Sequence, residues 1–257
     1  MLRNRVIPVL LHDETGLVKT REFGESVYIG DPINAVRIFN EKEVDELILL
    51  EIGRTRRGLG PDFDLVKRIS SECFMPLGYG GGIGSLDDAK QLFATGIEKI
   101  VLQTAAILNP ELIEKISEFS GKQSVAVSVD VYRDKDGLPK VYHASKRKKL
   151  ALPLLPYLKS LQDIGCGEII LTSVHKEGQM QGMDLEMISL ARSSVTIPIV
   201  AHGGARNIDD LVKAVEAGAD AIAAGSMFVF YKTRKGVLIN YPAYEELEKR
   251  LGKTNVI

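Results

Sequence analysis

Two glycine-rich segments of this sequence combine backbone amides with a nearby hydroxyl group, an arrangement that can hold a phosphate. Residues 79–84 read YGGGIG and are followed by Thr104, whereas residues 202–205 read HGGA and are followed by Ser226. Glycine lets the backbone approach an anion closely and adopt a positive φ, and amides at the start of a helix attract negative charge. The pattern predicts two phosphate sites, which would suit a ligand with a phosphate at each end. The alternative is that the glycines only form tight turns between strands and helices.

The two glycine segments occupy equivalent places in an internal repeat. Residues 46–52 (ELILLEI) align with residues 168–174 (EIILTSV), an offset of 168 − 46 = 122. The same offset pairs further residues without a gap, namely Pro76 with Pro198, Gly81 and Gly82 with Gly203 and Gly204, Gly96 with Gly218, and Thr104 with Ser226. We therefore predict two half-barrels, at about residues 1–122 and 123–245, and a C-terminal helix that reaches residue 257.

Short apolar runs alternate with helical patterns in each half. Runs that are apolar on both faces are typical of parallel strands covered by helices. Ser85 and the acids after it mark the start of one such helix, which continues over residues 89–95. Eight strand–helix units over residues 1–257 predict an α/β fold, a single (β/α)₈ TIM barrel. The predicted strands are Val6–Leu10, Glu46–Ile52, Met75–Gly78, Lys99–Leu102, Val125–Val131, Glu168–Val174, Ile197–Ala201 and Ala221–Ala224.

Composition narrows the classes of function. Apolar residues make up 45% of the 257 residues and charged residues 26%, and the formal net charge is −1. Such a balance gives no overall field that attracts nucleic acid or a membrane surface, and no apolar run reaches the roughly 18 residues of a membrane span. The two cysteines lack the spacing of metal ligands or a disulfide framework. We expect a cytoplasmic protein without a metal or cofactor.

With these features in place, the chain resembles the cyclase subunit of imidazole glycerol phosphate synthase over nearly its whole length. The resemblance implies a barrel that receives ammonia from a glutaminase docked at its N-terminal face. It also implies a two-phosphate substrate at the opposite end, where two aspartates perform acid–base chemistry. The matching stretches are RVIP at 5–8, GDP at 30–32, DEL at 45–47, GGGI at 80–83, TAA at 104–106 and GCGEIILTS at 165–173.

The resemblance is uneven at the predicted ligand end. Asp130 matches the second catalytic aspartate, but Leu11 stands at the position of the first. Leucine cannot exchange a proton, and general acid–base help is worth roughly 10²–10⁴ in rate. His12 or Asp13 could only substitute if the strand presented them to the same face, and a shift of one residue points a side chain away. Lys19 matches a lysine of the family's mobile first loop, and by resemblance the phosphate sites include Gly81, Gly82, Gln103, Thr104, Gly178, Gly203, Gly204, Gly225 and Ser226.

The opposite end of the predicted barrel keeps the family's charged entrance for ammonia. The four matching residues are Arg5, Glu46, Lys99 and Glu168. Two cations and two anions can satisfy one another there, so the alternative is a purely structural plug at the barrel bottom. A different basic segment, residues 143–149 (HASKRKK), follows the fifth strand, where it forms either a solvated loop or part of an anion site.

These observations favour a barrel that still conducts ammonia but no longer performs the usual cyclisation. The C-terminal stretches GSMFVF at 225–230 and VLINYP at 237–242 are similar to a branch of the family that accompanies a glutaminase and a sugar amidotransferase. In that branch, ammonia converts an N-acetyl group of a nucleotide-linked sugar into an acetamidino group. Two alternatives remain open: an authentic cyclase of histidine synthesis, and a non-catalytic scaffold that activates a HisH-like glutaminase.

Overall fold

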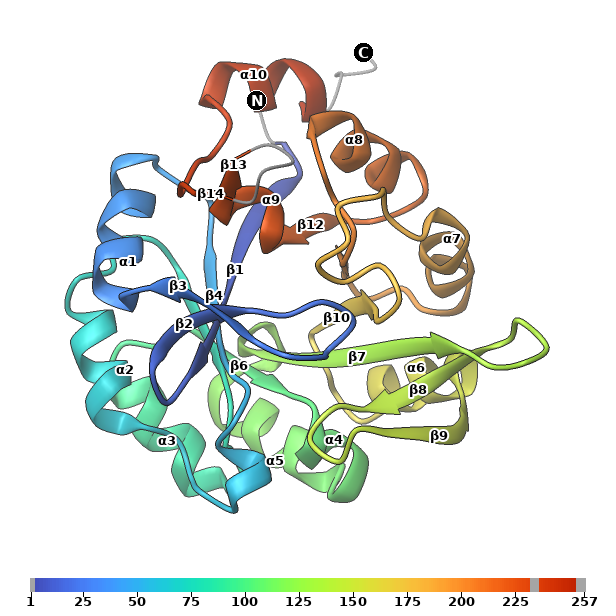
Figure 1. Ribbon diagram of the computed structural model, residues 1–257. Helices are drawn as coiled ribbons and strands as arrows, with labels where there is room; N and C mark the ends of the chain where they lie inside the picture. The colour runs from blue at the N-terminus through green and yellow to red at the C-terminus, as the bar shows by residue number, and fades with distance from the viewer. Residues whose placement is uncertain (1–2, 232–235, 253–257) are drawn as a thin grey trace, which may run out of the picture.

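Eight parallel strands form a closed barrel in the computed structural model, which describes residues 3–231 and 236–252 (Figure 1). Each strand pairs with the next one around the ring, and pairing of β7 with β10 and of β12 with β1 closes it. The prediction of a (β/α)₈ barrel is confirmed. In ring order the strands are β1 (Arg5–Asp13), β4 (Leu47–Glu51), β5 (Leu77–Gly80), β6 (Lys99–Leu102), β7 (Val125–Arg133), β10 (Glu168–Ser173), β11 (Ile199–His202) and β12 (Ala221–Ala224).

Helices cover the outside of the barrel, and α10 lies beside α8 in this outer layer (Figure 1). The predicted C-terminal helix is α10 (Tyr244–Leu251), which ends before residue 257, and residues 253–257 lie outside the described part of the chain. The other helices are α1 (Pro32–Glu41), α2 (Phe63–Ser70), α3 (Leu86–Ala94), α4 (Thr104–Leu108), α5 (Glu111–Ser120), α6 (Leu154–Asp163), α7 (Leu185–Ser194), α8 (Ile208–Glu216) and α9 (Ser226–Val229), with 3-10 turns η1 (Thr55–Arg57) and η2 (Lys122–Ser124).

The sequence repeat is visible in the positions of the elements. Strands β5 and β11 begin at Leu77 and Ile199, helices α3 and α8 begin at Leu86 and Ile208, and each pair is 122 residues apart. The short helices α4 and α9, which begin at Thr104 and Ser226, keep the same offset. The two glycine turns therefore lie at equivalent places around the ring.

Several predicted strand boundaries are wrong by two or more residues. Strands β5 and β11 begin after Pro76 and Pro198, because proline has no amide hydrogen to donate to a ladder. The carbonyl oxygens of both prolines still accept bonds from the neighbouring strands. Strand β1 extends to Asp13 because its end pairs with β2 (Gly16–Lys19), which the sequence analysis did not predict. The other unpredicted strands are β3 (Val27–Gly30), β8 (Pro139–His143), β9 (Lys148–Pro153), β13 (Phe230–Tyr231) and β14 (Gly236–Val237).

Alternation along each strand separates two apolar cores. On β1, Val6 and Leu10 pack outward against the helices, whereas Ile7, Val9 and Leu11 belong to a second cluster inside the barrel. This is the period of two expected for a strand. Leu11 therefore points into the barrel, at the end of the strand where the first catalytic aspartate was expected.

Ser85 stabilises the start of α3 through a capping box. Its hydroxyl accepts a bond from the Asp88 amide at 3.1 Å, and the Asp88 carboxylate accepts one from the Ser85 amide at 2.9 Å. We predict that Ser85→Ala lowers the free energy of unfolding by about 1 kcal/mol, measured by urea denaturation. Ser193→Ala is the control, since that exposed hydroxyl bonds only to Leu190 of its own helix. Equal stability of the two variants would contradict the prediction.

Candidate functional site

A cavity of about 550 Å³ opens at the carboxyl ends of the barrel strands. Its lower wall is apolar and includes Val9, Leu11 and Ile48. Asp130 and the glycine turn after β5 line the same cavity. Its volume is typical of a small-molecule site, for which roughly 300–1,000 Å³ is usual. The structure thus brings together the predicted acid, the residue that stands at the missing acid's position, and the first predicted phosphate turn.

Asp130 is a buried carboxyl group that forms no ion pair with any described residue. It is 3% exposed on β7, and the Ser128 hydroxyl donates to it at 3.3 Å. Burial raises the pKa of Asp130 to about 7, with a further contribution from the nearby carboxylate of Glu177, while hydrogen bonds from Ser128 and Thr172 oppose the rise. A carboxyl group with a pKa near neutrality can both accept and donate a proton.

No second acid stands at the Leu11 position, which lies on the strand opposite Asp130 in the ring of eight. His12 turns away from the cavity, where its Nδ1 lies 3.6 Å from the Glu51 carboxylate. Asp13 returns to the cavity rim because it lies two residues after Leu11. Burial disfavours its charged form, but Arg57, which donates at 2.9 Å, and the Glu14 amide together outweigh that effect and lower the pKa of Asp13. Asp13 is therefore an ion-paired carboxylate, in contrast to Asp130.

Lys19 is buried beside an acid that the sequence analysis did not select as a site residue. Its ammonium group donates to the Val9 carbonyl at 2.7 Å and is 3% exposed. Burial lowers the pKa of Lys19 to about 8, and the Glu177 carboxylate counteracts this. Burial likewise raises the pKa of Glu177, whose carboxylate also accepts from Thr20 at 3.1 Å. Glu177 directly precedes Gly178, which was selected as a phosphate-site residue, so its place in the sequence was the available signal.

The first glycine turn packs closely against its surroundings. Gly82 has a φ of +71°, and a Cβ atom there would lie 2.6 Å from the Gly60 carbonyl carbon. Its amide already donates to the Thr55 hydroxyl at 3.1 Å. Thr104 Oγ1 lies 3.0 Å from both Gln103 Oε1 and Ser145 Oγ. Two hydroxyl groups and an amide side chain therefore gather next to the turn. Ser145 belongs to residues 143–149, for which a solvated loop and part of an anion site were the two alternatives, and the turn between β8 and β9 brings it next to the glycine turn.

The second glycine turn encloses much less space. A cavity of about 10 Å³ lies among Gly178, Gly203, Gly204, Gly225 and Ser226. The Lys19 ammonium occupies the space that a Cβ atom on Gly225 would need. Within the described residues, the buried Ser226 hydroxyl has no hydrogen-bond partner. The turn has the predicted groups, but the space among them is far smaller than in the first cavity.

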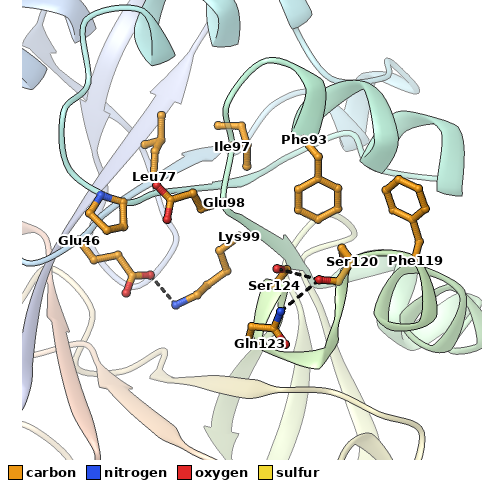
Figure 2. Close-up of a pocket in the computed structure, with 11 residues that line it drawn as sticks. Glu46, Leu77, Phe93, Ile97, Glu98, Lys99, Phe119, Ser120, Gln123 and Ser124 are labelled. Carbon is orange, nitrogen blue, oxygen red and sulfur yellow. Dashed lines mark hydrogen bonds and ion pairs between the residues drawn. The ribbon is translucent and has the colours of Figure 1, made fainter.

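At the amino ends of the strands, four charged side chains form a closed ring. Arg5 pairs with both Glu46 and Glu168, and Lys99 bridges the same two carboxylates at 2.6 and 2.7 Å. The glutamate side chains are only 5–6% exposed, and that of Lys99 is 13% exposed. Figure 2 shows the Glu46–Lys99 pair at the edge of a neighbouring pocket. The structure thus joins all four predicted entrance residues into one balanced set of ion pairs.

A hollow of about 540 Å³ lies beside this ring, between the ends of α3 and α5. Its walls include Phe93 and Phe119, whose ring centroids are 6.3 Å apart, and Glu98 lies next to Lys99 (Figure 2). Phe119 is 54% exposed, and the Lys90 ammonium lies 5.5 Å from the centroid of its ring. The hollow therefore offers an apolar surface with charged residues at one edge.

Within the described part of the chain, no group of three or more His, Cys, Asp or Glu side chains is placed to hold a metal ion. Among the helices of residues 3–231 and 236–252, none is both long and apolar enough to span a bilayer.

Comparison with known proteins agrees with the geometry. Residues 5–234 match the family described as "Histidine biosynthesis protein". A Vibrio vulnificus protein named "Putative imidazole glycerol phosphate synthase subunit hisF3" is 44% identical over 256 residues, covering 98% of this chain and 97% of the relative. The hisF2 counterpart from Pseudomonas aeruginosa is 43% identical over 249 residues, covering 96% and 99%. "Imidazole glycerol phosphate synthase subunit HisF" of Streptomyces avermitilis is 37% identical over 232 residues, covering 90% and 92%.

The raised pKa of Asp130 makes folding stability depend on pH. A carboxyl group whose pKa is higher in the folded state favours folding below its unfolded value, about 3.8, and this contribution is lost as the pH rises through about 7. We predict that Asp130→Asn gains stability relative to the unmodified chain between pH 5 and pH 8, on the order of 2 kcal/mol by urea denaturation. The exposed Asp163→Asn change serves as control. A difference between Asp130→Asn and the unmodified chain that does not vary with pH would contradict the burial argument.

Proposed function

Since this chain belongs to the histidine biosynthesis protein family, among imidazole glycerol phosphate synthase HisF subunits, we propose that it is an ammonia-conducting barrel of a glutamine-dependent complex. Its partner is a HisH-like glutaminase, and the ammonia serves the amidation of a nucleotide-linked sugar by a sugar amidotransferase. The observation that carries the proposal is a contrast along β1. Arg5 keeps its place in the charged ring, whereas Leu11 has replaced the acid at the other end.

The composition of the ring supports a role beyond plugging the barrel. Desolvating four charges is costly, and well-packed apolar residues of similar volume are often as stable as a buried ion-pair network. The ring also faces the barrel interior, because Arg5 lies on the same inward face of β1 as Ile7 and Val9. A neutral ammonia molecule that passes between these side chains would continue into the barrel interior.

The hollow beside the ring supports glutaminase docking at this face. Interfaces between subunits are enriched in aromatic side chains at their centres, and Phe119 is exposed there. The neighbouring Glu98 and the ring provide polar groups at the edge of the same surface (Figure 2). A glutaminase bound here would release ammonia directly next to Lys99.

The carboxyl-terminal cavity supports the loss of cyclisation. Leu11 and its inward neighbours make the wall opposite Asp130 apolar. A single acid with a pKa near 7 can transfer a proton. The usual ring closure uses two acids on opposite sides of the substrate, and this cavity supplies only Asp130 in such a position. The cavity thus suits ligand binding and passage of ammonia better than the usual cyclase reaction.

One observation favours the authentic cyclase as a second candidate. Glu177 follows β10, the strand next to β7, and its carboxylate acts electrostatically on Asp130. Two acids in one cavity are a common basis for acid–base catalysis. However, Glu177 is engaged by Thr20 and the buried Lys19, and it lies beside Asp130 rather than opposite. The scaffold alternative gains support only if no nitrogen passes through the barrel.

Removing the Lys99 ammonium tests the passage of nitrogen. Lys99→Met leaves Glu46 and Glu168 with one cation, so the entrance holds excess negative charge that retains ammonium ions instead of passing ammonia. In a reconstituted system of barrel, glutaminase and sugar amidotransferase, we predict that glutamine-supported amidation falls roughly tenfold, a barrier change of about 1.4 kcal/mol. Amidation supported by added ammonium chloride should persist.

The matched control is Lys115→Met, which removes an exposed ammonium group on α5 that pairs only with Glu111. Unaltered glutamine-supported amidation in Lys99→Met would reject gating at the ring and favour the scaffold alternative.

Restoring the missing acid tests the other end. We predict no cyclase turnover by the unmodified chain with the histidine-pathway substrate and free ammonium. Leu11→Asp places a carboxyl group opposite Asp130 and should raise turnover by roughly 10² or more, measured by product formation. Leu11→Asn, which is polar but cannot exchange a proton at this pH, should give no increase. Substantial turnover by the unmodified chain would instead support the cyclase.

A further inference from the structure

Two arginines stand at the rim of the carboxyl-terminal cavity without a partner. Arg56 lies in η1 after β4, and Arg147 lies in the turn between β8 and β9. Both line the cavity that contains Gly82, Thr104 and Ser145. Both are exposed, and within the described residues neither guanidinium group makes a hydrogen bond or ion pair. They are cations held at a cavity mouth with their donors unused.

Arg56 differs from the two arginines near it, because both of those have an acidic partner. Arg54 pairs with Asp62 at 3.6 Å and also donates to the Gly60 carbonyl, and Arg57 pairs with Asp13 at 2.9 Å. Arg56 acts on Asp13 only through its longer-range field. Of three arginines within four residues, the one that lines the cavity is the one left without an acid.

The backbone fixes both arginines near the first glycine turn. Gly82 donates to Thr55, the residue immediately before Arg56, so η1 is tied to the turn. On the other side, Thr104 bonds to Ser145, two residues before Arg147. The Arg147 amide closes its turn on the Ala144 carbonyl at 3.0 Å. Both anchors are hydrogen bonds to the predicted phosphate site, one on each side.

We propose that this end of the cavity binds an organic diphosphate: one phosphate sits at the Gly82 turn with Thr104 and Ser145, and the second lies between Arg56 and Arg147. Guanidinium groups match phosphate oxygens in planar, two-pronged hydrogen bonds. This inference rests on the proposed function because it assumes that the glycine turn holds a phosphate. It adds that the ligand is a diphosphate. The rest of the ligand faces the apolar Leu11 and Val101 on one side and the polar Asp130 on the other, which suits a group with both apolar and hydrogen-bonding parts.

The second glycine turn is a poor place for the other end of such a ligand. Its cavity is about 10 Å³, and the Lys19 ammonium lies directly against Gly225. The open 550 Å³ cavity therefore concentrates unpaired positive charge at one end only. Glu25, which also reaches the rim, partly offsets this charge, so Glu25→Gln should strengthen binding of a diphosphate.

Titration calorimetry of the full chain with inorganic phosphate and inorganic pyrophosphate, without divalent cations, tests this site. We predict that Arg56→Ala and Arg147→Ala each weaken pyrophosphate binding roughly tenfold and phosphate binding less than about twofold, because only the second phosphate meets the rim. Arg68→Ala on α2, an exposed arginine away from the cavity, is the matched control and should change neither affinity. Circular dichroism of each variant establishes that it is folded.

Each other outcome overturns the diphosphate site. Equal weakening of phosphate and pyrophosphate would mean that the arginines only add general charge, and no effect in either variant would remove them from the site. Failure of both anions to bind the unmodified chain would reject the phosphate role of the glycine turn as well. None of these outcomes affects the ammonia proposal, because the amidation assay of Lys99→Met tests the opposite end of the barrel.

Discussion

The alternation of side chains along the barrel strands is the constraint on which the structure depends. On β1, residues of one parity face the interior, so Arg5, Ile7, Val9 and Leu11 form a single inward row. At about 3.3 Å per residue, this row spans roughly 20 Å from the charged ring to the cavity. One strand thus connects the face that would receive nitrogen with the face that would use it. A change at either end of the row alters one face and leaves the other unchanged.

Buried charges are neutralised by ion pairs at the ring, whereas the buried carboxyl group in the cavity is not. At the ring, each of two carboxylates contacts two cations, so the desolvation of all four side chains is compensated locally. In the cavity, Asp130 has no such cation, and burial raises its pKa to about 7. Lys19 and Glu177 compensate each other next to it and hold the segment after β2 against the end of β10. Among the described residues that line the cavity, those without an ion pair include Asp130 inside and Arg56, Arg147 and Glu25 at the rim, which is where ligand chemistry is expected.

Regular features of the barrel could be predicted from the sequence because they are local or repeated. Apolar runs and helix caps such as Ser85 depend on neighbouring residues, and the 122-residue offset placed the two glycine turns in equivalent positions. The ring also followed from resemblance, and its four side chains do meet. By contrast, β2, β3, β8 and β9 are short strands whose placement depends on contacts distant in sequence, such as Phe23 against Tyr142. For the same reason, the Lys19–Glu177 pair and the nearly closed second turn could not be predicted, and the phosphate roles of these residues remain predictions.

The central claim is that nitrogen crosses the barrel interior without mixing with solvent. The most direct measurement supplies the unmodified complex with glutamine labelled with ¹⁵N in its amide group and a large excess of unlabelled ammonium. The amidated sugar is then analysed by mass spectrometry. Enclosed transfer predicts that nearly all of the incorporated nitrogen carries the label while glutamine is being hydrolysed. A product whose ¹⁵N fraction equals that of the bulk ammonium pool would contradict the account.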